Sequence, residues 1–195
     1  MQFDINHLIK QALLAGASAA TIIPPEAIVI GPQLAAVCSE PRCENYGLSK
    51  SCPPYVKGPN YFLKLLERSK YCLALRIEIP AVILFSTERE EVMRLLHEIV
   101  ADVEQQAHHG GWTNSRGFAG GSCKKIFCAL HADCRVVGNI GECRHPASAR
   151  PSMSGFGVNV AKMMESAGWS DKKNIRLKNS SSDSMSWVAG LVLIG

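Results

Sequence analysis

Seven of the eight cysteines in this 195-residue chain lie in two short segments that are rich in turn-forming residues. The segments read CSEPRCENYGLSKSCPP and CKKIFCALHADCRVVGNIGECRHP. They hold, in order, Cys38, Cys43 and Cys52, and then Cys123, Cys128, Cys134 and Cys143. In a reducing compartment, clustered thiols are more often metal ligands or redox groups than disulfides. The pattern therefore predicts a metal or redox centre on two loops, at about residues 38–58 and 121–151.

Three chemistries compete for these seven thiols. Zinc sites usually take cysteines in pairs about two to four residues apart. Here the gaps of four residues fit a zinc site, but those of five and eight do not. An iron–sulfur cluster is larger, so its thiolates can be more widely spaced, and Cys52-Pro53 resembles the cysteine–proline ending of bacterial ferredoxin motifs. The spacing favours an iron–sulfur centre, and it leaves open zinc and a dithiol redox pair, which usually needs closer cysteines.

The two loops differ in the number of ligands that they supply. The four cysteines of the second loop are enough to saturate one [4Fe–4S] cluster, which suits electron transfer. The three cysteines of the first loop leave one ligand position of such a centre without a cysteine. Another side chain fills that position, or it stays open to a substrate. The candidates for a fourth ligand are His131, Asp133, His145 and Cys72. We nevertheless expect Cys72, alone in the apolar run YCLALRI, to be a small buried hydrophobic residue.

Composition and charge set limits on the class of protein. Hydrophobic residues make up 47% of the chain and charged residues 19%, which is typical of a globular domain. The net charge of +4 is too small for a dedicated nucleic-acid binder. The basic residues in and beside the cysteine loops nevertheless suit an anionic, thiolate-ligated cluster. They are Arg42, Lys50, Lys124, Lys125, Arg135, Arg144 and Arg150.

The two ends of the chain indicate a cytoplasmic protein without a membrane anchor. The first residues lack the basic region of a signal peptide and carry Asp4 and Lys10. The closing run WVAGLVLIG is apolar but too short to span a bilayer as a helix. We therefore predict a soluble protein with free cysteines, and a strand at this run.

The periodicity of the sequence predicts the elements that position the two loops. We expect helices from Asp4 to Gly16, from Pro59, from a capping box at Thr87 to about His108, and from Ser152 or Ser154 to Ala167, and strands at 27–30, 71–79 and 187–194. The serine-rich and lysine-rich stretch at about 170–186 is expected to be mobile. Helices and strands alternate, so the prediction is a single α/β domain over residues 1–195, with a small mixed sheet and flanking helices.

Two motifs together resemble a known family. The motif CxxxxC…YG…SCPP is followed by GSCKxxxC…C…GECRHPxxARPSMSGFGVNV, and the combination is similar to the predicted metal-binding proteins of domain of unknown function 2284. The resemblance implies a microbial cytoplasmic protein that binds an iron–sulfur cluster through the seven cysteines and has no assigned reaction. Many members of that family space the early cysteines of the second motif two residues apart, which raises the question of whether Cys128 and Cys134 both bind metal.

Three functions are compatible with these patterns. The first is an electron-transfer or redox-accessory protein that serves a partner protein. The second is an enzyme that uses an iron–sulfur cluster with an open site, and the third is an interaction module stabilised by zinc. The sequence contains no Walker lysine motif, no dinucleotide-binding fingerprint and no HExxH motif. It leaves undecided whether the protein is an enzyme and what its oligomeric state is.

Overall fold

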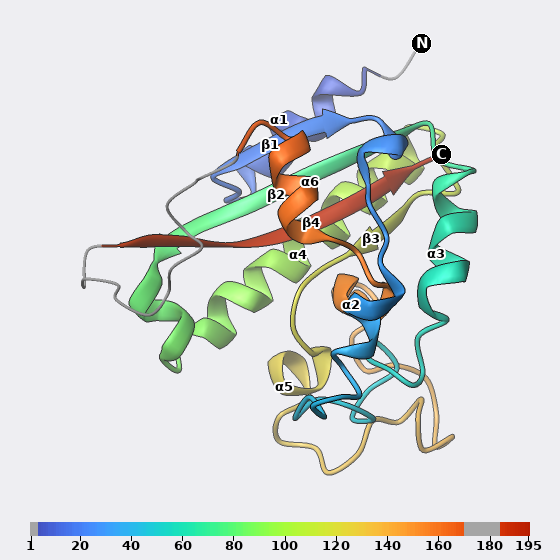
Figure 1. Cartoon of the computed structure of the whole chain (residues 1–195), viewed down its shortest axis with the longest axis vertical. Coiled ribbons are helices and arrows are strands. Elements are labelled where there is room, and N and C mark those ends of the chain that lie inside the picture. Colours follow the sequence, from blue (N-terminus) through green and yellow to red (C-terminus); the bar gives the residue numbers. More distant parts are fainter. Residues whose placement is uncertain (1–3, 170–183) are drawn as a thin grey trace.

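The computed structural model describes residues 4–169 and 184–195. In this part of the chain a four-stranded sheet carries helices on both faces (Figure 1). The strands are β1 Ala19–Ile23, β2 Tyr71–Pro80, β3 Arg116–Phe118 and β4 Met185–Ile194. The α-helices are α1 Asn6–Leu14, α2 Pro32–Ala36, α3 Gly58–Leu66, α4 Arg89–His109, α5 Cys123–Phe127 and α6 Val160–Ser166. Three 3₁₀ segments lie at Pro25–Ala27, Ala81–Phe85 and Met153–Phe156.

The strands follow the order β1-β2-β4-β3, and each described pair is antiparallel. The two long strands β2 and β4 pair along their whole length, from Tyr71 opposite Ile194 to Pro80 opposite Met185. The α/β class is confirmed, although the sheet is antiparallel rather than mixed. Each of these strands pairs with a neighbour that runs in the opposite direction, so the helices between them do not act as crossovers between parallel strands.

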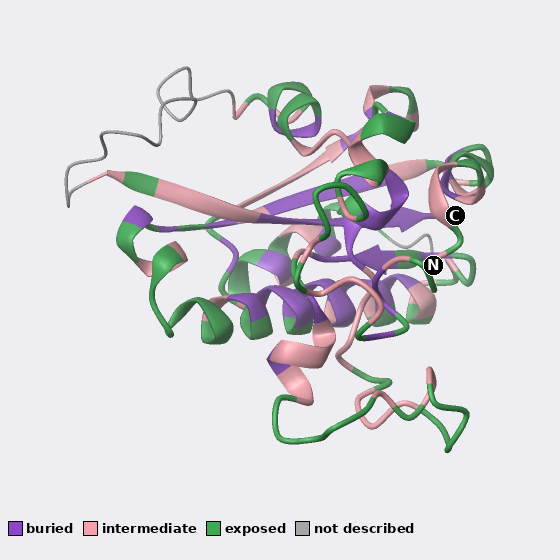
Figure 2. Cartoon of the chain, turned by 60° about the horizontal axis from the view of Figure 1, so that its bottom comes forward, coloured by how far each residue is buried: buried purple, intermediate pink, exposed green. Residues whose placement is uncertain are grey.

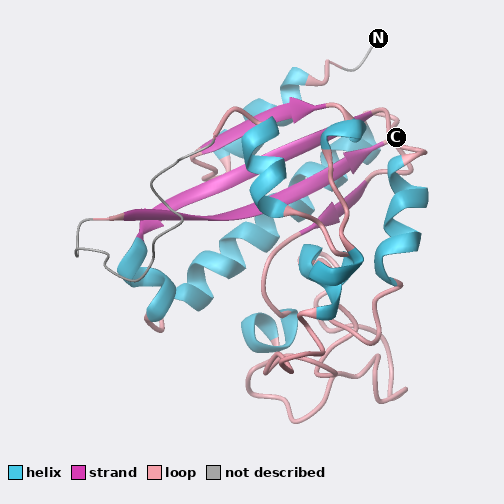
Figure 3. Ribbon diagram, in the orientation of Figure 1, coloured by secondary structure: helices cyan, strands magenta, loops and turns pink. Residues whose placement is uncertain are grey.

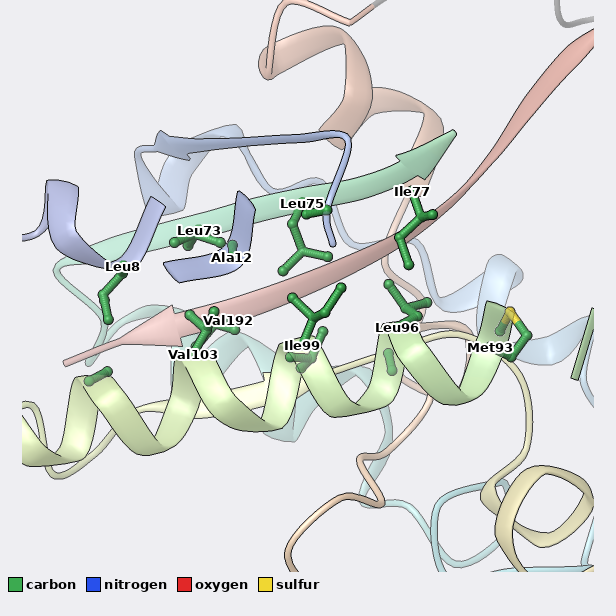
Figure 4. Close-up of a cluster of buried hydrophobic side chains, with 14 of the residues drawn as sticks. Leu8, Ala12, Leu73, Leu75, Ile77, Met93, Leu96, Ile99, Val103 and Val192 are labelled. Atoms are coloured by element: carbon green, nitrogen blue, oxygen red, sulfur yellow. The ribbon is translucent and has the colours of Figure 1, made fainter. Parts of the chain in front are cut away.

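The long helix α4 and the short helix α1 cover one face of the sheet. Leu73, Leu75 and Ile77 alternate along β2 and point towards α4, where they meet Leu96 and Ile99 (Figure 4). This alternation follows from the pleat of a strand, in which every second side chain lies on the same face. The periodicity that predicted α4 is thus the apolar stripe that packs on the sheet.

The opposite face of the sheet is covered by α3, α6 and the 3₁₀ segment Met153–Phe156. Phe62 of α3 packs against Phe118 of β3, with 4.7 Å between the ring centroids. Cys72 is fully buried in this second core, as predicted. Two cores on either side of one sheet make a three-layer arrangement.

Three local predictions differ from the structure. The edge strand is β1 and not residues 27–30, where only Ile30 forms an isolated bridge, to Val158. The helix predicted from Ser152 or Ser154 is interrupted at Gly157, whose φ of 72° is a left-handed conformation, and α6 begins beyond it with Asn159 accepting a hydrogen bond from the Lys162 N–H at 3.0 Å. The helix expected from Thr87 is present as α4, but it has no side-chain cap at its first turn.

Both cysteine loops lie at one end of the molecule, beyond α2, α5 and the start of α3. Figure 3 shows this end as coil except for short helices, and Figure 2 shows it as mostly exposed or half-buried. The core therefore lies in the sheet layers, and the loops form a separate region attached to them. The segment predicted to be mobile falls mainly at residues 170–183, outside the described residues. No helix in the described ranges has both the length and the apolar character needed to cross a membrane.

Candidate metal centre

The two cysteine loops come from opposite halves of the chain, and direct contacts hold them together. The Ser152 N–H donates to the carbonyl oxygen of Ser51 at 3.1 Å. Lys125 forms an ion pair with Glu44 at 2.7 Å. The hydroxyl of Ser51 lies 2.6 Å from the sulfur of Cys123. These contacts bring the seven thiols into one region. The sequence alone could not show that the two loops meet.

The four cysteines of the second loop line a single small cavity of about 20 Å³. They form what we call the four-cysteine group, namely Cys123, Cys128, Cys134 and Cys143. The cavity is also lined by Ser49 of the first loop and by His145. The stretched spacing between Cys123, Cys128 and Cys134 therefore does not separate these thiols, because α5 and the turns after it bring them back to the same cavity.

Cys134 lies in surroundings that favour its thiolate. Burial acts to raise its pKa, but backbone N–H groups of Lys50, Val137 and Val136 hydrogen-bond to the sulfur, and the charge of Arg144 lies nearby. These donors outweigh burial and lower the pKa of the Cys134 thiol. One of them, Lys50, belongs to the first loop, so the two loops build this part of the site together.

Cys123 lies in contrasting surroundings. Burial is the main reason why its pKa is raised, and the nearby Cys52 and Cys143 raise it further. The hydrogen bond with the Ser51 hydroxyl acts in the opposite direction. Because the charge of Cys52 reaches Cys123, the first and second groups of thiols adjoin each other at these two residues.

The three cysteines of the first loop line a different and much larger cavity, of about 470 Å³. They form the three-cysteine group, namely Cys38, Cys43 and Cys52. The pKa of Cys38 is raised by burial and by the charges of the other two thiols, which lie close to it. The seven thiols therefore do not share one cavity but divide between two.

None of the side chains suggested as a fourth ligand for the three-cysteine group lines its cavity. His145 lines the cavity of the four-cysteine group instead, and its ring stacks on Phe127 with 5.3 Å between centroids. Cys72 is buried in the strand β2, and burial raises its pKa to about 12. Among the described residues, the remaining polar side chains on this cavity wall include Asn45, Ser154 and Asn159.

The described residues contain no group of three or more His, Cys, Asp or Glu side chains that converges on a point where one metal ion would sit. A single zinc ion requires such convergence, since its thiolate sulfurs lie only about 2.3 Å from the metal. The thiols instead surround cavities, with space between them. The structure therefore groups the thiols by the cavity that they line, four in one and three in the other.

Basic residues near the cysteines donate to loop carbonyl oxygens, and Lys124, Arg135 and Arg144 also line the cavity of the four-cysteine group. Lys124 donates from its ammonium group to the carbonyl oxygens of Cys128 and His131, at 2.8 and 2.6 Å. Arg144 donates to the carbonyl oxygen of Asp133 at 3.1 Å. Carbonyl oxygens at the turns of a loop need donors, and these cations provide them.

A buried polar network attaches the second loop to α4. His97 is fully buried; its Nε2 lies 2.9 Å from the Gly120 carbonyl oxygen, and its Nδ1 accepts the Arg150 N–H at 3.1 Å. The Arg150 guanidinium also pairs with the buried Glu104. The ring of Phe127 contacts that of His97, with 5.5 Å between centroids. This network fixes both ends of the second loop, since Gly120 precedes it and Arg150 closes it.

Sequence reasoning identified the cysteines but assigned no role to three polar residues beside them. The Ser51 hydroxyl hydrogen-bonds with the sulfur of Cys123, Ser49 lines the same cavity as that thiol, and the Asn45 side-chain amide donates to the sulfur of Cys43 at 3.9 Å. The sequence feature that could have pointed to these three residues is their position between Cys43 and Cys52, within the first motif. Their contact with sulfur depends on how the loops fold, so it is visible only in three dimensions.

Comparison with known proteins gives one match. A family model described as predicted metal-binding protein (DUF2284) matches residues 21–194. The matched range includes both cysteine loops and extends from within β1 to the end of β4. No curated protein and no solved structure matches the chain.

Proposed function

Because the chain belongs to the DUF2284 family of predicted metal-binding proteins, we propose that its four-cysteine group holds a [4Fe–4S] cluster that passes electrons to a partner protein. The observation that carries this proposal is the division of the seven thiols between two adjoining cavities, one of them lined by four cysteines. Four thiolates are the ligand set of a [4Fe–4S] cluster. When bound, such a cluster supplies one-electron oxidation and reduction.

The surroundings of the four-cysteine group suit an anionic cluster. The N–H groups that donate to Cys134 and the hydroxyl beside Cys123 direct partial positive charge at the sulfurs. Hydrogen bonds to the sulfurs raise the reduction potential of iron–sulfur clusters. With four protein thiolates, the centre has no open iron, so its chemistry is electron transfer and not substrate binding.

Iron–sulfur is favoured over zinc because the gaps of five and eight residues between cysteines are wider than those of usual zinc sites. The alternative is an interaction module stabilised by zinc. Measurement of the iron and zinc content of the protein distinguishes it from this proposal. All eight cysteines are free thiols, which fits a reducing compartment and supports a cytoplasmic location. We propose a redox protein as the binding partner, and we propose that the chain binds neither nucleic acid nor a membrane.

The three-cysteine group favours a second candidate function, that of an enzyme. Its cavity of about 470 Å³ has three thiols on the wall and none of the expected fourth ligands. A second [4Fe–4S] cluster on these cysteines would keep one iron open to a small molecule, as a Lewis acid. The volume is within the range of small-molecule sites in proteins, about 300–1,000 Å³.

The experiment that tests the proposal is optical and electron paramagnetic resonance spectroscopy of protein purified without oxygen. We expect a brown protein whose broad visible absorption is bleached by dithionite, with a paramagnetic signal in the reduced state. For the four-cysteine cluster, that signal should not change when small ligands are added. A colourless protein with no reducible chromophore would overturn the proposal.

A further inference from the structure

We propose that the cavity beside the three-cysteine group binds a small hydroxycarboxylic acid with an apolar body. This inference rests on the second candidate function, because a cluster on Cys38, Cys43 and Cys52 would face the bound molecule. The ligand class follows from three features of the cavity wall, namely its single cation, its apolar side chains and one unpaired buried oxygen.

The charge of the wall indicates an anionic ligand. Arg89, the first residue of α4, is the one Lys or Arg among the described residues that line the cavity, and no Asp or Glu lines it. Arg89 forms none of the ion pairs found in the described part of the chain, although the pKa of the nearby Glu44 carboxyl is lowered by Lys125 and, less strongly, by the charge of Arg89. A guanidinium binds a carboxylate with two parallel hydrogen bonds, and Arg89 supplies such a group to this wall.

The other side of the cavity is apolar. Leu34, Val37, Val158 and Val160 line it, and they come from α2 and from the segment that leads into α6. Val158 is buried, whereas Val37 is 57% exposed, so the apolar wall extends from the interior to the rim. An apolar body on the ligand would remove this surface from water.

The third feature is the side chain of Asn45, which lines the same cavity as the three thiols and Arg89. Its Nδ2 donates towards the sulfur of Cys43. Its Oδ1 is buried and has no hydrogen-bond partner in the structure as described. A buried acceptor without a donor is costly, so such an atom calls for a partner. A hydroxyl group on the ligand would donate to it.

Arg89 and Asn45 also line a second cavity of about 470 Å³, together with Gly121. The two cavities therefore share one wall, and Arg89 faces both. The second cavity contains Glu44, Glu90 and Lys125, and Lys125 is already paired with Glu44. The acidic residues on that side disfavour an anion there, so we place the carboxylate on the cysteine side of Arg89.

The test is isothermal titration calorimetry of racemic mandelate into protein purified without oxygen. Mandelate carries a carboxylate, a hydroxyl and an apolar ring, while mandelamide lacks the carboxylate and phenylacetate lacks the hydroxyl. We expect mandelate to bind, and mandelamide and phenylacetate to bind about tenfold more weakly, which is the usual size of one hydrogen bond to a charged or buried group. Equal binding of mandelate and mandelamide would overturn the inference.

Variants assign the binding to the cavity. Arg89→Gln should weaken mandelate binding about tenfold and leave mandelamide binding unchanged. Arg68→Gln, a matched change at an exposed arginine that lines a different cavity, should alter neither. Mandelate binding that is the same in Arg89→Gln and the unchanged protein would contradict the assignment.

Iron content, measured on the same samples, separates this inference from the proposed function. Arg89→Gln should keep the iron of the unchanged protein, because Arg89 is not a ligand. A chain that holds iron but binds none of the three probes would overturn the inference alone. A chain without iron would overturn the proposed function, whatever it binds.

Discussion

At the scale of single residues, the four thiols proposed to bind one cluster lie in unequal surroundings. Cys134 accepts hydrogen bonds from backbone N–H groups, which lower its pKa, whereas burial raises the pKa of Cys123. Cys134 is therefore the thiol of these two that loses its proton more readily. Metal binding requires deprotonated sulfur, so we expect this difference to influence the order in which the ligands engage the metal.

Substitution of cysteines should separate ligands from the bystander. We expect Cys143→Ser to lose most of its iron and sulfide, because it removes one of four thiolates from the cluster. Cys72→Ala should keep its iron and lose about 1 kcal/mol of unfolding free energy, since Cys72 only fills space in the core. Iron analysis and chemical denaturation measure the two effects. Full iron content in Cys143→Ser would reject the assignment of the four-cysteine group.

His97 should make the stability of the protein depend on pH. Burial lowers its pKa to about 4, from an ordinary value of 6.5; the Gly120 carbonyl opposes this shift and the charge of Arg150 adds to it. The neutral ring satisfies both of its partners, since one nitrogen donates to Gly120 and the other accepts the Arg150 N–H. Between these two pKa values the unfolded chain binds a proton that the folded chain does not, so stability falls as the pH falls through this window.

The expected loss at His97 is about 2 kcal/mol of unfolding free energy between about pH 7.5 and about pH 5. Denaturant unfolding of the anaerobic protein at the two pH values measures it. His97→Gln should show a correspondingly smaller loss, whereas the matched change His109→Gln, at an exposed histidine, should behave like the unchanged protein. The same pH dependence in His97→Gln would contradict this account.

At the scale of elements, α4 packs closely on the sheet because glycines face it. A Cβ at Gly190 of β4 would overlap the Val100 side chain and lie 3.3 Å from those of Leu75 and Leu96. A Cβ at Gly117 of β3 would lie 2.7 Å from the Val100 side chain. The small residues allow the helix to approach the strands, and the helix in turn carries His97 to the second cysteine loop.

Filling this contact should destabilise the fold. We expect Gly190→Ala to lower the unfolding free energy by about 1–3 kcal/mol through overpacking. Gly190→Ala should cost less unfolding free energy when it is added to Val100→Ala than when it is added to the unchanged protein. The shorter side chain at position 100 makes room for the added methyl group. Gly138→Ala, where the new Cβ would make ordinary contacts at 3.6 and 3.8 Å, is the matched control. Thermal unfolding of the four variants and the unchanged protein measures these losses, and additive losses in the double variant would rule out overpacking.

The strongest periodic patterns predicted their elements well, and the short ones did not. α4 and β2 were predicted because each repeats apolar residues over many positions, at the helical period or as an apolar run. β1 has only five residues, AATII, which carry too little pattern to distinguish a strand. α6 was predicted to begin too early because the left-handed conformation of Gly157 depends on a close approach to Gly31, which is remote in sequence.

At the scale of the whole molecule, the site forms where two halves of the chain meet. The sequence was sufficient to predict seven cysteines as ligands, which stays a prediction, and to predict that Cys72 is buried in the core, which the structure confirms. It could not show that the thiols divide between two cavities, because that division depends on contacts such as Ser51 with Cys123, between residues 72 positions apart. It also could not give the antiparallel strand order, which depends on pairing between distant segments.

The most direct test of this account is the iron, sulfide and zinc content of each chain after purification without oxygen. We predict about four iron and four sulfide per chain if only the four-cysteine group is filled, and about eight of each if the three-cysteine group is filled as well. Zinc should be present only in trace amounts. Stoichiometric zinc with neither iron nor sulfide would contradict the account.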